Sequence, residues 1–297
     1  MLDNKRKKTV LALGYFDSVH LGHQTVIKSA KDYAQKVNAQ LVVVTFEGNL
    51  KSALGKEQEK CVFSKEERQK FLQDLLVDEI YFAPITKDFL SLDRQAFLDL
   101  LNEKYQVCCY FSGEDYRFGR FGEGTVDYLK KYAIDNNQEC FAVEMLNFEG
   151  QKISTTAIKE LLREGNLKKV NALLNRPYSI TGKVFSDRKV GSSIGFPTIN
   201  LKIENDKHQL KDGVYAGHLE IDKVKYLALI NYGGRPTFNL QDKLIEAHIV
   251  DFNGQLYDRE ITLCFDYFMR EIKRFENANQ LKAQLDCDLE MIRNKRI

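Results

Sequence analysis

The stretch TVLALGYFDSVHLGHQTVIKSAKDYAQKV, residues 9–37, decides the first half of the fold. Its first six residues, 9–14, form an apolar run of strand length that ends in a glycine. From residue 24 to residue 37, apolar side chains recur at helical spacing and share one face: Val26, Ile27, Ala30, Tyr33, Ala34 and Val37. The stretch therefore predicts a strand, a loop and an amphipathic helix, which together form one β-α unit.

Further apolar runs continue this pattern through the first half of the chain, at residues 41–46, 79–83, 107–111 and 140–143. Helical stretches separate them, and one of these opens at Ser64, where Glu67 completes a capping box. Continuous apolar strands that alternate with helices indicate a parallel sheet covered on both faces. Ligands of such sheets bind at the carboxyl ends of the strands, so the loops of interest are residues 14–23, 47–50 and 112–124.

Beyond Asn175 the chain changes to strands that follow one another directly. Three of the four prolines lie in this part, and short Gly or Asp turns separate strand-like runs at residues 178–185, 214–221, 224–231, 244–250 and 261–265. Consecutive strands without crossover helices predict an antiparallel sheet or a small barrel. A closing helix follows, with an apolar stripe formed by Leu281, Leu285, Leu289 and Ile292.

Two helical pieces, residues 155–163 and 167–174, lie between the two patterns. The length of 297 residues also agrees with about two domains. We therefore expect a first domain at residues 1–174 and a second domain at residues 175–297.

Composition excludes several classes of protein. Lys and Arg total 44 against 42 Asp and Glu, and a net charge of +2 provides no general field for nucleic acid or an anionic membrane. No apolar stretch approaches the roughly 20 residues of a membrane span. The six cysteines are dispersed and form neither a disulfide framework nor a CxxC metal motif, which indicates a cytoplasmic protein.

Two of the five histidines, His20 and His23, lie near the expected N-terminus of the first helix, between Gly14 and the helix proper. Backbone N–H groups at such a terminus favour anions, and imidazole N–H groups can stabilise charge on phosphate oxygens. Gly22 lets the backbone approach a ligand closely. The alternative is an ordinary helix-capping loop; a zinc pair is disfavoured because no third ligand stands at metal spacing. Neither a GxGxxG fingerprint nor a P-loop motif occurs.

Seven strings carry a resemblance to a known family. They are GYFDSVHLGH (14–23), GEDYRFG (113–119), ISTTAIK (153–159), GFPTINL (195–201), GVYAG (213–217), GRPTF (234–238) and EAHIVDF (246–252). In this order and spacing they resemble the bacterial bifunctional riboflavin kinase/FAD synthetases, over nearly the whole chain. The resemblance implies an N-terminal α/β nucleotidyltransferase domain with an HxGH motif and a Rossmann-like parallel sheet. It also implies a C-terminal six-stranded antiparallel β-barrel with a terminal helix.

For the first domain, the resemblance implies transfer of AMP from ATP to FMN, which yields FAD and pyrophosphate. Its catalytic residues are His20 and His23. The resemblance implies that ATP and its phosphates contact Gly14, Asp17, Gly22, Ser154, Thr155, Thr156 and Lys159, and that the flavin contacts Asn49, Asp115, Arg117 and Phe118. From the residues alone, the ISTTAIK hydroxyls at a helix start suit an anion or an ordinary cap, and the GEDYRFG loop suits ring stacking or a purely structural role.

For the second domain, the resemblance implies phosphorylation of riboflavin, with Glu246 as general base, Gly191 at the ATP phosphates and Arg235 at the flavin. In an extended GFPTINL segment, Thr198 and Asn200 fall on one side and offer neutral oxygen ligands to an ATP-bound Mg²⁺. Without the resemblance, Glu246 fits a solvent-facing strand carboxylate, and the PTIN residues fit a turn that enters a strand.

The chain departs from the family pattern in four places. Ser18 replaces a glycine, and residues 47–50 of TFEGNL (45–50) differ from the family's TFDPHP, which puts Asn49 in place of a histidine. Lys159 replaces an arginine, and Ser192 replaces the arginine that usually follows Gly191. Alternative hypotheses are therefore an enzyme with only one of the two activities, or a non-catalytic flavin-binding regulatory protein. The expected partners are riboflavin, FMN, FAD and ATP, without nucleic acid or membrane, in a monomer or weak homo-oligomer.

Overall fold

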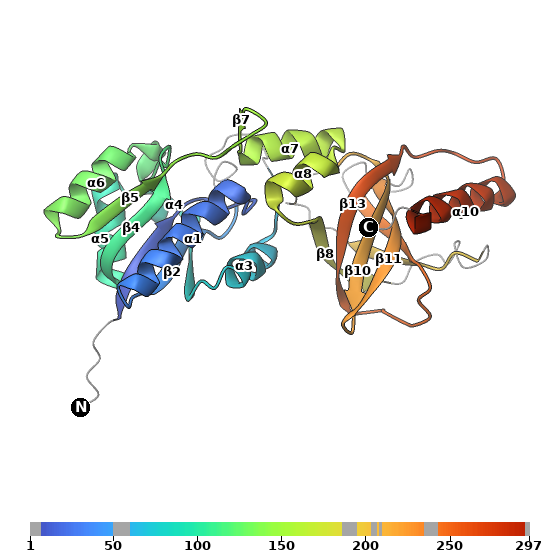
Figure 1. Cartoon of the computed structure of the whole chain (residues 1–297), viewed down its shortest axis with the longest axis horizontal. Helices are drawn as coiled ribbons and strands as arrows, with labels where there is room; N and C mark the ends of the chain where they lie inside the picture. The colour runs from blue at the N-terminus through green and yellow to red at the C-terminus, as the bar shows by residue number, and fades with distance from the viewer. Residues whose placement is uncertain are drawn as a thin grey trace. The chain divides into compact units, whose positions relative to one another are not determined.

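The computed structural model describes residues 7–49, 60–185, 195–202, 207, 210–234 and 243–294. The chain forms two compact units, residues 1–155 and 156–297 (Figure 1). The helices α7 (Thr155–Glu164) and α8 (Leu167–Leu174), which we expected at the end of the first domain, fall in the second unit apart from Thr155. The reason for α8 is local, because it contacts strands β8 (Tyr178–Phe185) and β13 (Glu260–Arg270).

The first unit is built on a parallel sheet, as the alternation of strands and helices predicts. Its five described strands lie in the order β3-β2-β1-β4-β5. Their bounds are β1 Lys8–Leu13, β2 Gln40–Phe46, β3 Glu79–Ala83, β4 Gln106–Gly113 and β5 Glu139–Val143. A small antiparallel hairpin, β6 (Asn147–Phe148) with β7 (Gln151–Lys152), follows the sheet.

Helices cover both faces of this sheet, which explains why the central strands are apolar throughout. Apolar side chains of α1 (Leu21–Lys36) and of α3 (Lys65–Asp74) pack on one face. Those of α5 (Arg94–Lys104) and α6 (Val126–Asp135) pack on the other, with Phe89 of the short α4 (Lys87–Ser91) beside them. A single 3₁₀ turn, η1 (Arg120–Gly122), lies in the loop before α6.

Local capping sets where these helices begin. The predicted capping box is confirmed, since the Ser64 hydroxyl accepts from the backbone N–H of Glu67 and the Glu67 carboxylate accepts from that of Ser64. The helix α1 begins at Leu21, three residues before the apolar pattern indicates, because the His20 side chain caps it. His20, a residue of the expected phosphate site, is therefore also the N-cap of α1.

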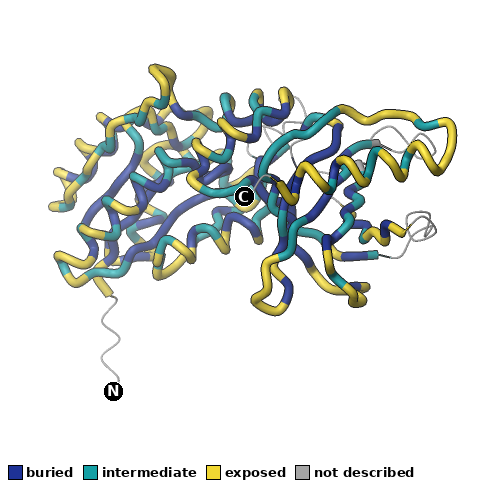
Figure 2. The backbone as a smooth tube through the Cα atoms, turned by 45° about the vertical axis from the view of Figure 1, so that its right-hand side comes forward, coloured by how far each residue is buried: buried dark blue, intermediate teal, exposed yellow. Residues whose placement is uncertain are grey.

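In the second unit, six described antiparallel strands close into a barrel in the order β10-β11-β12-β9-β8-β13. The strands not yet bounded are β9 Thr198–Lys202, β10 Gly213–Ile221, β11 Val224–Gly234 and β12 Lys243–Ile249. The expected barrel is therefore confirmed, and β9 supplies the sixth strand that the apolar pattern did not show. Figure 2 shows dark blue, buried backbone concentrated in the strands, whereas the helices alternate between buried and exposed.

The terminal helix α10 (Ala278–Asn294) covers part of the barrel's outer wall. Its predicted apolar stripe packs Leu285, Leu289 and Ile292 on Val214 and Ala216 of β10 and on Leu229 of β11. A buried ion pair accompanies this packing, with Asp288 on the helix and Arg270 on β13. Across the described ranges, no helix combines the length and the apolar character that a membrane crossing requires.

Candidate functional site

The loop between β1 and α1 brings the two motif histidines into direct contact. The backbone N–H of His23 donates to Nδ1 of His20 at 3.1 Å, which makes His20 the N-cap of α1. The two imidazole rings stack, with centroids 3.6 Å apart and planes 14° from parallel. Because Nδ1 of His20 accepts a hydrogen bond, its ring carries a proton on Nε2, which leaves an N–H donor at a helix N-terminus.

Two bulky residues of this loop have left-handed backbone conformations. Phe16 and Val19 both have a φ of 43°, and both side chains are about 1% exposed. Such conformations cost roughly 1–3 kcal/mol each and persist where surrounding packing fixes them. The Phe16 ring meets His23 edge-on, with centroids 5.2 Å apart. The same ring lies over Gly14, where a Cβ would fall 2.6 Å from Phe16 Cζ.

Gly22 has a comparable steric reason to be glycine. A Cβ at this position would lie 3.1 Å from Cε1 of His20. The space beside Gly22 is therefore filled by the capping imidazole, so this glycine makes room for a ring of the protein itself. The sequence indicates a second role for Gly22, which is to let a ligand approach the backbone closely, and the two roles are compatible.

Neighbouring segments hold the loop in place. Asp17 is fully buried, and its Oδ1 accepts from the backbone N–H of Val62 at 2.8 Å. Ser18 is also fully buried, and its hydroxyl lies 3.0 Å from that of Thr155, where α7 begins. The structure thus joins the histidine loop to the ISTTAIK segment through a residue that departs from the family pattern.

The remaining ISTTAIK residues lie on either side of the division between the units. Ser154, partly buried, precedes α7, and Thr156 is the first residue of the second unit. Lys159 lies on α7 and is 7% exposed, on the side of the helix that buries Ile158 and Leu162.

The residues expected at the flavin have different environments. Asn49 is partly buried and follows Gly48, whose carbonyl accepts from the Tyr15 hydroxyl at 3.1 Å. Asp115 is paired with Lys152 at 2.7 Å. Phe118 is only 5% exposed and packs in the core against Phe97, with ring centroids 5.6 Å apart. The Phe118 ring is therefore a core element that fixes the loop.

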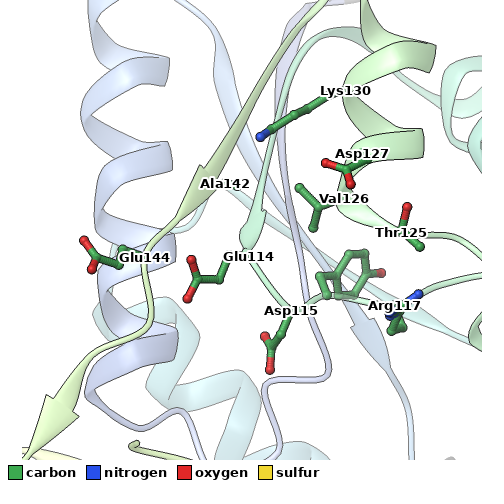
Figure 3. Close-up of a pocket in the computed structure, with 10 residues that line it drawn as sticks. Glu114, Asp115, Arg117, Thr125, Val126, Asp127, Lys130, Ala142 and Glu144 are labelled. Atoms are coloured by element: carbon green, nitrogen blue, oxygen red, sulfur yellow. The ribbon is translucent and has the colours of Figure 1, made fainter.

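A pocket of about 620 Å³ lies next to this loop (Figure 3). Its side chains come from the loop after β4, from the start of α6 and from the end of β5: Glu114, Asp115, Tyr116, Arg117, Thr125, Val126, Asp127, Lys130, Ala142 and Glu144. Two of the expected flavin contacts, Asp115 and Arg117, therefore share a cavity wall. Acidic side chains gather here, although the described residues contain no group of three His, Cys, Asp or Glu side chains arranged to hold a metal ion.

In the barrel, strand register aligns three polar residues across three strands. Glu246 on β12 is opposite Asn200 on β9 on one side and opposite Asn231 on β11 on the other. Residues directly opposite in a sheet point to the same face, so the carboxylate lies between two amides. Oδ1 of Asn200 and Oδ1 of Asn231 are buried and have no hydrogen-bond partner within the described part of the chain.

Sequence reasoning missed Asn231, although one signal was present. It is a polar residue within the otherwise apolar LALIN stretch of β11. Such a residue at the centre of a barrel strand needs a polar neighbour or a ligand.

The GFPTINL segment is extended, which was the condition for its predicted geometry. Thr198 and Asn200 are alternate residues of β9, and Thr198 is opposite His248. Nδ1 of His248 lies 2.8 Å from the carbonyl oxygen of Pro197, which anchors the start of the strand. Two further expected site residues, Gly191 and Arg235, lie outside the described residues, as does Ser192.

Comparison with known proteins also divides the chain into two parts. The FAD synthetase family profile matches residues 2–157, and the riboflavin kinase profile matches residues 174–295. A bifunctional riboflavin kinase/FMN adenylyltransferase of Listeria monocytogenes is 36% identical over 282 residues, covering 94% of this chain and 90% of the relative. The Bacillus subtilis protein of the same name is 31% identical, with coverages of 97% and 92%.

A solved structure is also similar over nearly the full length. The crystal structure of a protein from Streptococcus pneumoniae superposes with a TM-score of 0.89 and 31% identity, covering 97% of this chain and 94% of that one. That protein bears the name macrolide-efflux protein. Both family profiles and the full-length relatives agree, and this chain belongs to the family of bifunctional riboflavin kinase/FMN adenylyltransferases.

Proposed function

We propose that each unit of this protein carries its own reaction centre for making flavin cofactors. The protein is a riboflavin kinase and an FMN adenylyltransferase. It converts riboflavin and ATP to FMN and ADP, and then FMN and ATP to FAD and pyrophosphate. The observation that carries this proposal is the presence in one chain of both a stacked histidine pair at a helix N-terminus and a strand carboxylate between two amides.

The adenylyl transfer belongs to residues 1–174 in this proposal. A phosphate oxygen of FMN attacks the α-phosphorus of ATP, and the bond to the bridging oxygen of pyrophosphate breaks. Both reactants are anions, so the site must neutralise charge and align the reacting atoms. His20 and His23 provide N–H donors for the phosphate oxygens at the α1 terminus.

Other residues of this domain bind and shape the site. Gly14, Asp17 and Gly22 keep the histidine loop in its strained form. The hydroxyls of Ser154, Thr155 and Thr156 and the ammonium of Lys159 bind ATP phosphates in this proposal. Lysine provides the charge but not the bidentate geometry of the usual arginine, so its phosphate contact is a point charge.

The flavin of FMN binds near the carboxyl ends of β2 and β4 in this proposal. Asn49 hydrogen-bonds it, and Arg117 faces its phosphate. Asp115 contributes a carboxylate that Lys152 holds in position. Because Phe118 is buried, we assign it the support of this loop.

Riboflavin phosphorylation belongs to residues 175–297. Glu246 accepts the proton of the riboflavin 5′-hydroxyl as its oxygen attacks the γ-phosphorus of ATP. The amides of Asn200 and Asn231 flank this carboxylate and give it a polar environment on both sides. Gly191 at the phosphates and Arg235 at the flavin complete the proposed set, outside the described residues.

Kinases and nucleotidyltransferases use ATP together with a divalent metal ion, and we propose Mg²⁺ here. The residues present fit it: Thr198 and Asn200 offer hard, neutral oxygens, and Oδ1 of Asn200 is a buried acceptor with no partner among the described atoms. When bound, the ion neutralises charge on the transferring phosphoryl group.

We also propose a cytoplasmic protein that is a monomer or a weak homo-oligomer, and that binds no nucleic acid. All six cysteines are free thiols, which supports a reducing compartment. The alternatives of one activity, or of flavin binding without turnover, lack the support that two family matches and full-length bifunctional relatives give to two activities.

One assay tests the assignment. Purified protein is incubated with ATP and Mg²⁺, once with riboflavin and once with FMN, and the flavins are separated chromatographically. His23→Ala should lower FAD formation about 10²- to 10³-fold and leave FMN formation intact. Glu246→Gln should lower FMN formation about 10²- to 10⁴-fold and leave adenylylation of supplied FMN intact. The matched control is Glu220→Gln, an exposed strand carboxylate of the same barrel. Equal loss of both steps in either site variant contradicts one reaction per domain.

A further inference from the structure

A second cluster of reactive side chains lies on the barrel wall, in strands β10 and β13. His218 on β10 is directly opposite Cys264 on β13. Nδ1 of His218 lies 2.8 Å from Oδ2 of Asp266 on the same neighbouring strand. These three residues have no role in the two proposed reactions, and together they form a Cys-His-Asp constellation.

A β-bulge produces this arrangement. The pairing of β10 with β13 shifts between Ala216 and Gly217, which leaves Asp266 as an extra residue between Phe265 and Tyr267. Bulges re-aim side chains, and this one brings the Asp266 carboxylate to the imidazole of His218.

Two further features fix the bulge. The side-chain amide of Asn171, on α8, donates to the carbonyl oxygens of Phe265 at 3.0 Å and of Asp266 at 3.3 Å. A Cβ on Gly217 would lie 2.1 Å from the carbonyl oxygen of Cys264, so only glycine permits this close approach of the strands. Figure 1 shows α8 beside β8 and β13, in agreement with its contacts. The cluster is therefore held by neighbouring structure on more than one side.

The charge state of His218 follows from its partners. Hydrogen bonds to Asp266 and to Cys264 raise the pKa of His218 to about 9. Its side chain is 14% exposed and that of Asp266 is 9% exposed, so solvent screens the pair only in part. Other charged groups nearby are Glu220, two residues along β10, and Lys207, which donates to the carbonyl of Ser179 opposite Cys264. The imidazole is a cation at neutral pH, next to a thiol.

We propose that Cys264 is a site of reversible thiol modification, where the imidazolium of His218, oriented by Asp266, stabilises the thiolate that exchanges with low-molecular-weight disulfides. The Cys264 proton leaves to solvent, because the imidazolium of His218 already carries a proton on each ring nitrogen. The Cys264 sulfur then attacks one sulfur of the disulfide, a new S–S bond forms and the old one breaks. The released thiolate takes up one proton, so the products are a mixed disulfide and one free thiol.

The other cysteines lack this environment. Burial raises the pKa of Cys108 and Cys109, and it raises the pKa of Cys140 to about 11. Cys61 is 3% exposed. Cys287 is exposed on α10, so it serves as the reference for a thiol that solvent reaches freely. Cys264 is partly exposed and lies directly opposite the imidazolium of His218, which distinguishes it from the other cysteines.

The experiment compares Cys264 with Cys287 in the same full-length protein. Glutathione disulfide is added at pH 6.5 and at pH 9.5, aliquots are quenched with acid, and peptide mass spectrometry gives the rate of mixed-disulfide formation at each cysteine. At pH 6.5 we expect Cys264 to react about tenfold faster than Cys287 despite its lower exposure. The ratio should fall towards or below one at pH 9.5, where the imidazole of His218 loses its proton and its charge.

Variants separate charge from access. His218→Gln should reduce the Cys264 rate at pH 6.5 about tenfold and leave the Cys287 rate unchanged. Glu220→Gln, on the same strand, should leave both rates unchanged, and Cys264→Ser should abolish the fast phase. Wild-type protein alone can overturn the proposal, so the test does not depend on whether the variants fold. The proposal is contradicted if Cys264 reacts no faster than Cys287 at pH 6.5 and the rates at the two cysteines change with pH in the same way. The result does not depend on the proposed reactions.

Discussion

The two proposed reaction centres of this protein are built in opposite ways. In the first unit, the histidine loop is one continuous segment, residues 14–23, which is held by a side-chain cap and contains left-handed backbone at Phe16 and Val19. In the barrel, Asn200, Glu246 and Asn231 come from separate strands and meet through register. A local centre depends on a few contacts within and around its loop, whereas a cross-strand centre depends on closure of the whole barrel.

This difference also decides where each unit is vulnerable. The loop stores backbone strain that buried packing must offset, so small steric changes there should matter. The barrel centre lies on regular strands, so it should respond to changes in remote contacts that hold the wall and the terminal helix together.

The largest effect is expected at the ion pair between α10 and β13. The Asp288 carboxylate is 1% exposed and accepts from Nε and Nη2 of Arg270 at 2.7–3.1 Å. Asp288→Asn leaves the Arg270 charge largely buried without its counter-ion, which should cost about 3–5 kcal/mol. Hydrogen exchange read by mass spectrometry should show this loss in peptides of β10–β13 and no change in β1 and β4. Asp286→Asn, a neutralisation elsewhere on α10, is the control. An equal loss of protection in both units would mean that the ion pair does not stabilise the barrel specifically.

The second effect is a pH dependence confined to the barrel. The pKa of His218 is raised from 6.5 to about 9, mainly by its hydrogen bond to Asp266. Because the folded pKa is the higher one, the charged imidazole stabilises the barrel fully below pH 6.5, and this contribution is lost as pH rises through 9. The loss should be at most about 3 kcal/mol. Hydrogen exchange of β10 and β13, corrected for intrinsic rates, checks it. In His218→Gln, the stability of the barrel should change less with pH over this range. The same pH dependence in the variant and in the wild type contradicts the assignment to His218.

Much of the fold was predictable because its determinants are local. The capping box at Ser64 and Glu67, the helix at residues 167–174 and the strand at 178–185 all follow from short-range chemistry, and the structure confirms them. The predicted start of α1 was three residues too late. Its N-cap is a histidine, which is outside the usual set of Ser, Thr, Asp and Asn, so the sequence showed no cap signal there.

Features that depend on register could not be predicted in this way. Asn231 becomes a neighbour of Glu246 only once β11 and β12 pair, and nothing between them in the sequence specifies that alignment. The bulge at Asp266 and the pairing of Arg270 with Asp288 have the same origin. The proposal of Glu246 as general base came only from the family resemblance, since its strand pattern alone fits a surface carboxylate.

A third prediction concerns steric fit in the loop. In Gly14→Ala the new Cβ would lie 2.6 Å from Cζ of the buried Phe16 ring, so the ring or the backbone must move. Such overpacking should cost about 1–3 kcal/mol in the first unit and displace the His23 ring that Phe16 contacts. FAD formation should fall while riboflavin phosphorylation is kept. At the control position, Gly48→Ala, the Cβ would lie 3.5 Å from Ile85 Cδ1, an ordinary contact. Equal effects of both substitutions contradict the steric argument.

The smallest effect is expected at Ser18, where this chain departs from the family's glycine. Its buried hydroxyl and that of Thr155 satisfy each other at 3.0 Å, so removing either one leaves the other without this bond. Ser18→Ala and Thr155→Val should each cost about 0.5–1.5 kcal/mol, and the double variant should cost less than their sum. Denaturation and FAD formation, measured around this double-mutant cycle, check the coupling. Additive losses would mean that the hydroxyls act independently, and the histidine loop and the ISTTAIK segment would then be positioned by backbone packing alone.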